Sequence, residues 1–199
     1  MRRLPALALV LLAIGIAIAL LPEPLRTALE CERNALAAGE WWRAWSGHVV
    51  HFSARHAAVD LAAAFALAAG IEMCCGHRAL AAMMLYAPPL LSLALYFSAP
   101  ELAVYRGASG LCAAFATILG LVLWKESPAM HAPLIALAGL FALKTWCEAT
   151  GFAANVSGLD EGVRVVWQAH AFGAVLGAGA FALWSRDIDC ALFPTVRTA

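Results

Sequence analysis

The segment 105-YRGASGLCAAF-115 begins an apolar run of the chain with a cluster of small residues around one serine. Gly107, Ala108 and Gly110 surround Ser109, where a helix in lipid would be expected to start with large apolar side chains. Small residues on a helix surface let a second membrane helix approach closely. The segment therefore predicts a membrane helix that leaves space for a partner helix and for a peptide beside Ser109.

The composition of the whole chain indicates a membrane protein. Of the 199 residues, 63% are hydrophobic and the mean hydropathy is +0.80, whereas a soluble domain is about 45–50% apolar. So large an excess requires lipid as the solvent for much of the surface. The 13 basic and 13 acidic residues cancel, so no basic field indicates a nucleic-acid partner. The common nucleotide-binding and metal-binding motifs are missing, and we expect neither a metal nor an organic cofactor.

Six apolar runs reach the length of about 17–25 residues that a membrane-spanning helix needs. They predict an all-α integral membrane protein, a six-helix bundle that forms one domain over residues 1–199. The first run has an alternative interpretation as a signal peptide, but the residues that follow it make a poor cleavage site. The predicted spans are roughly 4–21, 54–73, 79–98, 107–124, 132–149 and 165–185.

The charges at the start of the chain predict its orientation. Arg2 and Arg3 favour a cytoplasmic N-terminus, and the later loops carry basic residues on both sides. With the N-terminus inside, the second, fourth and sixth helices all enter the membrane from the outer side. The long outer connection over 22–53 is expected to lie at the membrane interface, where tryptophan is favoured. Its tryptophans are Trp41, Trp42 and Trp45.

Four polar side chains are expected at one depth in the membrane. His56 and Asp60, Ser109, and His170 lie in the first turns of the second, fourth and sixth helices. At about 1.5 Å per residue, all four fall within roughly 10 Å of the outer boundary. Ionisable groups inside a membrane are costly and usually face the protein interior or a water-filled cavity. The three helices are therefore expected to bring a serine, two histidines and an acid together.

Two stripes of small residues predict which helices meet at this depth. His170 shares one stripe with Gly173 and Gly177, and Ser109 lies on another, each at spacings of three and four residues. If the helices pack through these stripes, Ser109 and His170 come within hydrogen-bond reach. A neutral imidazole can then take the serine proton and activate the hydroxyl as a nucleophile. Each stripe alone is more often simple helix packing, so the combination carries this prediction.

Other polar groups have supporting or structural interpretations. A tetrahedral intermediate needs donors for its oxyanion, and we expect them from His56 and the Ser109 N–H, supported by Asp60 and Gly107. Glu72 is interpreted as a cap of its helix or as an acceptor of backbone hydrogen bonds. Lys144 and Glu148 stand at i and i+4, and we interpret them as a pair that neutralise each other's charge. The residues interpreted as structural are His48, His51, Glu72, Lys144 and Glu148.

The combination resembles the rhomboid family of intramembrane serine proteases. Residues 107–110 are similar to the family's G-x-S-G nucleophile motif, and His170 with Gly173 and Gly177 to its base-bearing A-H-x-x-G-x-x-x-G helix. His56 stands where the family has the histidine of H-x-x-x-N. The resemblance covers most of the chain and implies a six-helix endopeptidase that cleaves within the membrane. It also implies Ser109 as the nucleophile and His170 as the base, both in a Ser-His dyad.

Within that family the chain is similar to the rhombosortase subgroup. The similar segments are 39-GEWWRAWSGHVVH-51 and the Lys144-x-x-x-Glu148 pair. This resemblance implies exported protein substrates with a C-terminal sorting tag: a Gly-Gly motif, one transmembrane helix and a short basic tail. It also implies a bacterial inner membrane, with lipid as the surroundings and an active site that opens to the periplasmic side.

Two positions depart from the family pattern. Asp60 stands where the family has asparagine, and an ionised carboxylate would repel an oxyanion that an amide would stabilise. Either Asp60 stays protonated, or it holds His56 and leaves the oxyanion to other donors. Ala113 stands one turn after Ser109, where relatives carry a ring beside the catalytic histidine. The base is therefore expected to be held less tightly.

Two of the cysteines are placed to form a disulfide. Cys31 and Cys147 both fall toward the outer side, where disulfides persist, and we predict a bridge between them, with two free thiols as the alternative.

Two alternative functions stay open. An inactive rhomboid-like protein that only binds transmembrane helices is one of them, and Asp60 favours it. A small transporter that relays protons is another, but it leaves the G-x-S-G motif unexplained.

Overall fold

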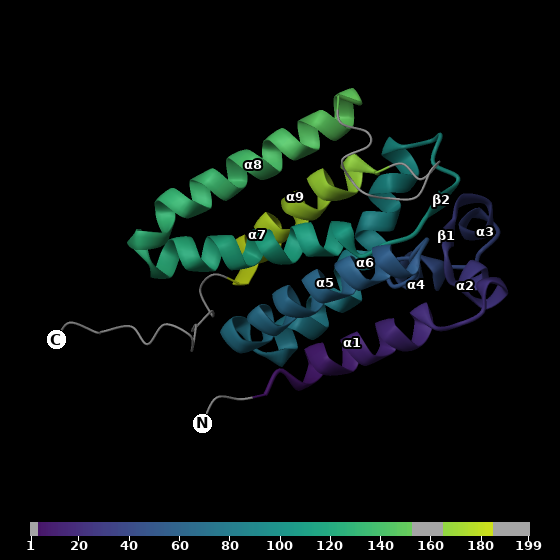
Figure 1. Cartoon of the computed structure of the whole chain (residues 1–199), viewed down its shortest axis with the longest axis horizontal. Helices are drawn as coiled ribbons and strands as arrows, with labels where there is room; N and C mark the ends of the chain where they lie inside the picture. The colour runs from purple at the N-terminus through teal and green to yellow at the C-terminus, as the bar shows by residue number, and fades with distance from the viewer. Residues whose placement is uncertain (1–3, 153–164, 185–199) are drawn as a thin grey trace.

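The computed structural model describes residues 4–152 and 165–184, and six helices of 14 or more residues dominate this part (Figure 1). Each overlaps one of the predicted apolar runs. They are α1 Ala6–Ala19, α5 Ala54–Cys75, α6 His77–Ser98, α7 Ser109–Glu126, α8 His131–Thr150 and α9 Trp167–Trp184. The shorter elements are α2 Glu23–Leu29, β1 Cys31–Glu32, α3 Arg33–Ala37, α4 Arg43–Ser46, β2 Val104–Tyr105 and a 3-10 turn over Pro128–Met130.

Four helical segments of the described residues are long and apolar enough to cross a membrane. They are α5, α6, α7 and the segment Pro128–Thr150, which contains α8. α1 has 14 residues, and α9 carries Gln168 and His170 in its first turns. The predicted count of six spans is therefore not confirmed in this part of the chain. Arg2 and Arg3, on which the predicted orientation depends, lie outside the described residues.

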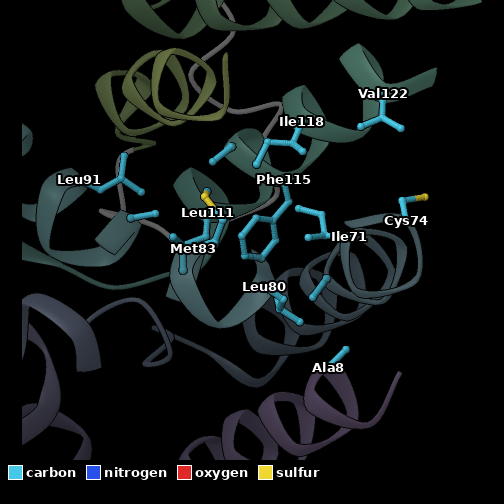
Figure 2. Packing of buried hydrophobic residues seen from close by; sticks show 13 residues of the cluster. Ala8, Ile71, Cys74, Leu80, Met83, Leu91, Leu111, Phe115, Ile118 and Val122 are labelled. Atoms are coloured by element: carbon cyan, nitrogen blue, oxygen red, sulfur yellow. The ribbon is translucent and has the colours of Figure 1, made fainter. Parts of the chain in front are cut away.

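The main apolar core lies between α5, α6 and α7 (Figure 2). Leu111, Phe115 and Ile118 recur on α7 at spacings of four and three, which places them on one helix face. They pack with Ile71 of α5 and Leu80 of α6, and none of the five is more than 3% exposed. Lipid is as apolar as these side chains, so close packing rather than water exclusion holds the helices together.

Glu72, near the end of α5, connects α1 to this core. Its carboxylate accepts the backbone N–H groups of Leu7 at 3.1 Å and Ala8 at 2.8 Å. Those donors lie in the first turn of α1 and have no partner within that helix. Of the two roles predicted for Glu72, the structure shows backbone bonding, but to a different helix.

α7 and α9 are in backbone contact. A Cβ atom on Gly173 would lie 2.1 Å from the Gly110 carbonyl oxygen, and one on Gly177 would lie 2.3 Å from the Ala114 carbonyl oxygen. Both distances are far shorter than van der Waals contact, so only glycine fits at either position. The α9 stripe of Gly173 and Gly177 thus packs as predicted, but on α7 it meets Gly110, Ala113, Ala114 and Thr117, a line beside the predicted stripe that contains Ser109.

The connection between α1 and α5 lies at the end of the bundle where α7 begins (Figure 1). β1 pairs with β2 in an antiparallel register that sets Cys31 opposite Tyr105. The indole N–H of Trp45 donates to the Leu85 carbonyl of α6 at 2.9 Å. Pro89 has no N–H to offer that carbonyl, so the indole replaces a missing helical bond.

α8 lies at the edge of the bundle beside α7 and α9 (Figure 1). None of its residues is buried, although its composition is apolar. Such a helix is suited to contact with lipid over most of its surface. Its position therefore depends on few contacts with the rest of the chain.

Candidate active site

The loop before α7 presents Ser109 at the first position of the helix. Gly107 has φ 135°, a conformation that L residues rarely adopt. A Cβ atom there would also lie 3.2 Å from the Asp60 carboxylate and 3.2 Å from the His56 ring. The Gly107 N–H donates to the Gly47 carbonyl at 3.1 Å. Backbone conformation and close neighbours thus both require glycine immediately before the serine segment.

Asp60 of α5 holds this loop through its carboxylate. Oδ2 accepts the Ala108 N–H at 2.8 Å and lies 3.3 Å from His56 Nε2 and 3.5 Å from His51 Nε2. One backbone hydrogen bond and two nearby imidazole nitrogens thus converge on one oxygen atom. Of the two predicted roles for Asp60, this geometry favours the one in which it holds His56 and leaves the oxyanion to other donors.

Two further histidine rings lie against this carboxylate. His51 is 1% exposed, and its ring meets the His56 ring edge-on with centroids 5.1 Å apart. The His56 ring also stacks on Phe52 with centroids 6.1 Å apart. His51 was interpreted as structural, and the structure brings it to the same carboxylate as the predicted oxyanion-side histidine.

The backbone at the start of α7 offers further donors. Ser109 is the first residue of the helix, so its N–H has no partner within the helix, and none is found among the other described residues. Helix N-termini carry a partial positive charge and bind anions. An oxyanion at this end of α7 would therefore meet a free N–H group beside the serine hydroxyl.

His170 is held by two residues of α8. Its Nδ1 lies 2.9 Å from Glu148 Oε2 and 3.4 Å from Lys144 Nζ, and Glu148 Oε1 pairs with the Lys144 ammonium. The side chains of His170 and Glu148 are 8% and 9% exposed. The Lys144–Glu148 pair, predicted to be self-contained, therefore extends to the predicted base.

Ser109 and His170 lie at the same level of the α7–α9 contact. A Cβ atom on Gly110, the neighbour of Ser109, would lie 3.1 Å from the carbonyl oxygen of Ala169, the neighbour of His170. Among the described residues, no hydrogen bond joins the two side chains, and His170 Nε2 has no partner. The structure thus brings the two helices together beside both side chains without closing the contact between their polar atoms.

Ala113 is the position where the resemblance to the family predicts a ring. A Cβ atom on Gly173 would lie 3.0 Å from the Ala113 Cβ. A larger side chain at this position would push α9 away from α7, because the gap between the helices is already filled. The small residue thus belongs to the same close contact that brings α9 beside Ser109.

His48 has the structural role predicted for it. Its Nε2 lies 3.0 Å from both the Pro88 carbonyl oxygen and the Ser92 hydroxyl of α6. The side chain is completely buried, and burial lowers the pKa of His48 to about 4. A neutral His48 therefore links the outer connection to α6.

The predicted disulfide between Cys31 and Cys147 is not formed, because both residues are free thiols. Cys31 is a buried residue of β1, and its thiol lies 3.7 Å from the Ser92 hydroxyl. Burial raises the pKa of the Cys31 thiol. Cys147 lies on α8 at the edge of the bundle. The prediction rested on both cysteines lying near the same face of the membrane. Two cysteines can share that depth and still lie on helices or strands that do not touch.

Sequence reasoning missed the link between α8 and α9. Lys144 and Glu148 satisfy each other at i, i+4, and that spacing says nothing about a third partner on another helix. A signal was nevertheless present, because Glu148 ends the fifth predicted span near the depth assigned to His170. No group of three or more His, Cys, Asp or Glu side chains within residues 4–152 and 165–184 is arranged to hold a metal ion.

The apolar helices, with a serine and a histidine at the contact between α7 and α9, define an integral membrane protein with a polar site inside a helical bundle. The family model for the Rhomboid domain matches residues 38–186, which is most of the chain and includes every residue of this site. The chain therefore belongs to the rhomboid family, whose members are generally intramembrane serine proteases. No curated protein matches the chain.

Proposed function

We propose that the chain is an active intramembrane endopeptidase in which Ser109 is the nucleophile and His170 the general base. Ser109 Oγ attacks the scissile carbonyl carbon while His170 Nε2 accepts the hydroxyl proton. The imidazolium then gives this proton to the leaving amine, and the acyl-enzyme remains on Ser109. Water, or an amine that takes its place, attacks the ester and releases the second product.

The observation that carries this proposal is the register of α7 against α9. The contact between Gly110 and Ala169 sets the serine and the histidine at one level on two helices that touch. His170 Nε2 has no partner among the described residues, so it is available to a hydroxyl. The proposal requires that Ser109 Oγ and His170 Nε2 come into contact when substrate binds, since catalytic hydrogen bonds are often long or absent before then.

In this proposal, backbone N–H groups stabilise the oxyanion more than the His56 side chain does. The Ser109 N–H at the start of α7 is free within the described residues. The His56 Nε2 faces Asp60 at 3.3 Å, so this carboxylate competes with the oxyanion for that donor. We infer that His56 and Asp60 mainly hold the Gly107 loop, and that the helix N-terminus supplies most of the stabilisation.

We further propose the rhombosortase subgroup for this chain. The similarity of residues 39–51 and of the Lys144–Glu148 pair supports this assignment. The substrates would be exported proteins with a C-terminal Gly-Gly motif, one transmembrane helix and a basic tail. The chain would form six spans in a bacterial inner membrane, with the N-terminus inside and the site open to the periplasm.

A second candidate is an inactive rhomboid protein that binds transmembrane helices without cutting them. The Asp60 carboxylate favours it, because a negative charge beside the Ser109 loop opposes the charge of an oxyanion. The Ala108 N–H, which donates to Oδ2, and the two imidazole rings beside that oxygen weaken this objection, since they offset part of the charge of the carboxylate.

Cleavage by the full chain in lipid vesicles tests both candidates. One single-helix substrate carries the Gly-Gly tag and basic tail, and a second has Leu-Leu in place of Gly-Gly. We expect cleavage of the first alone, measured by product mass, and its loss in Ser109→Ala and in His170→Ala. Ser98→Ala changes an exposed serine at the end of α6 and is the matched control.

The other outcomes separate the proposals. Equal cleavage of both substrates contradicts the tag specificity but keeps the protease. Binding without cleavage by the wild type supports the inactive candidate. Cleavage that persists in Ser109→Ala shows that another residue is the nucleophile.

A further inference from the structure

A buried carboxylate faces the ring nitrogen of His170 that points away from catalysis in the proposed dyad. Glu148 Oε2 lies 2.9 Å from Nδ1, and both side chains are more than 90% buried. We propose that Glu148 is a positioning residue that fixes the tautomer and orientation of His170, so that the site works as a serine–histidine–glutamate triad. This inference rests on the proposed function, since it assigns a role within that same reaction.

The tautomer follows from the hydrogen-bonding capacity of the two groups. An ionised carboxylate only accepts, and a neutral imidazole has one N–H. The Lys144 ammonium can only donate, but its contact with Nδ1 is longer, at 3.4 Å against 2.9 Å for Glu148. The shorter carboxylate contact therefore decides, and it places the proton on Nδ1 of His170. Nε2 then has a free lone pair and can accept the Ser109 proton. The same carboxylate stabilises the imidazolium that forms when this proton arrives.

Lys144 keeps Glu148 in place and offsets its charge. The ammonium pairs with Oε1, so the two carboxylate oxygens have different partners and the group cannot rotate freely. An unpaired carboxylate within a membrane helix would be costly. The charged or titratable groups that act on His170 are Glu148 and Lys144 from α8 and Asp60 from α5. Of these, Glu148 makes the shortest contact with the ring.

Contacts from α8 take the place of the ring expected at Ala113: Glu148 holds Nδ1 of His170, and the Phe141 ring meets the imidazole edge-on with centroids 6.4 Å apart. Ala113 allows the close α7–α9 contact, but it leaves no aromatic side chain one turn after Ser109 to hold the base. Within the described residues, the polar contacts between α8 and α9 all involve Lys144, Glu148 and His170. Because α8 makes few other contacts with the bundle, these contacts also couple the orientation of the base to the position of that helix.

The rate of labelling by a fluorophosphonate probe tests this role in the full chain in lipid vesicles. We expect Glu148→Gln to lower the maximal labelling rate by about 10- to 100-fold, as when a carboxylate that orients a functional histidine is lost. The probe concentration at half-maximal rate should not change, because Glu148 does not touch the probe. Glu72→Gln makes the same change at a carboxylate that bonds α1, and should label like the wild type.

A double variant separates positioning from charge imbalance. Glu148→Gln leaves the Lys144 ammonium unpaired 3.4 Å from His170. If that charge alone slowed the reaction, Lys144→Met with Glu148→Gln would restore the wild-type rate and overturn the proposal. We expect the double variant to stay slow. In the wild type, the nitrogen-15 spectrum of His170 should show a protonated Nδ1, and a protonated Nε2 would also overturn it.

Failure of this inference differs from failure of the proposed function. Wild-type labelling in Glu148→Gln, together with no labelling in Ser109→Ala and His170→Ala, overturns the triad and keeps the dyad. Labelling that survives Ser109→Ala overturns both.

Discussion

The Gly110 carbonyl oxygen lies so close to Gly173 that a Cβ atom there would come within 2.1 Å of it. This contact sets α9 against α7 one residue beyond Ser109, and His170 lies three residues before Gly173 on the same helix. The catalytic geometry proposed for this rhomboid thus depends on helix packing as much as on the two reacting side chains.

Gly173→Ala should displace α9 and reduce labelling of Ser109. The added methyl group meets the backbone of α7 rather than a flexible side chain, so overpacking should cost about 1–3 kcal/mol of stability. Labelling rate and thermal unfolding in detergent measure both effects. Gly179→Ala is the matched control, because nothing lies within 4 Å of its Cβ position. An equal loss in the two variants would contradict the packing argument.

Gly107→Ala should impair the site without disrupting the core. Its φ of 135° disfavours a side chain, and the methyl group would press on His56 and Asp60 at 3.2 Å. We expect a drop in labelling rate of more than tenfold, since about 1.4 kcal/mol of misalignment suffices for that. Gly151→Ala also has a positive φ but open space around it. Similar activity loss in Gly151→Ala would show that backbone strain alone explains the result.

Substitutions of Asp60 distinguish a loop-holding role from an inhibitory charge. Asp60→Ala removes the acceptor of the Ala108 N–H and should lower stability by about 1–3 kcal/mol, with loss of labelling. Asp60→Asn retains an oxygen acceptor and removes the negative charge beside the proposed oxyanion site. It should therefore label at least as fast as the wild type. Slower labelling in Asp60→Asn would show that the carboxylate charge itself is needed.

His48 predicts how stability depends on pH. Burial lowers its pKa from 6.5 to about 4, so the folded state binds fewer protons than the unfolded state between these values. Stability should therefore fall as the pH drops from 6.5 toward 4, by on the order of 1–3 kcal/mol. His48→Gln lacks this titration, and its unfolding midpoint in detergent should depend less on pH. Parallel curves for the two proteins would contradict this assignment.

The sequence predicted the elements of the site better than their connections. The small residues around Ser109 and after His170 indicated two closely packed helices, because small residues at spacings of three and four let membrane helices approach each other. The contact between Glu148 and His170 was missed, because a residue pair that satisfies itself at i, i+4 needs no third partner; only the similar depth of the two residues indicated the contact.

Two further differences between the prediction and the structure concern contacts between residues far apart in the sequence. The β1–β2 pair joins residues more than 70 positions apart through two residues each, too short for any periodic signal. The predicted disulfide failed for a related reason. Depth in the membrane says which end of the bundle a cysteine occupies, but not which neighbour it meets, and Cys31 lies beside Ser92 instead of Cys147.

The central claim is that His170 activates Ser109, and mass spectrometry of the fluorophosphonate adduct tests it most directly. The wild-type chain in native membranes should carry one adduct, on the peptide that contains Ser109, and His170→Ala should carry none. An adduct on another residue, or equal modification of Ser109 in His170→Ala, would contradict the account.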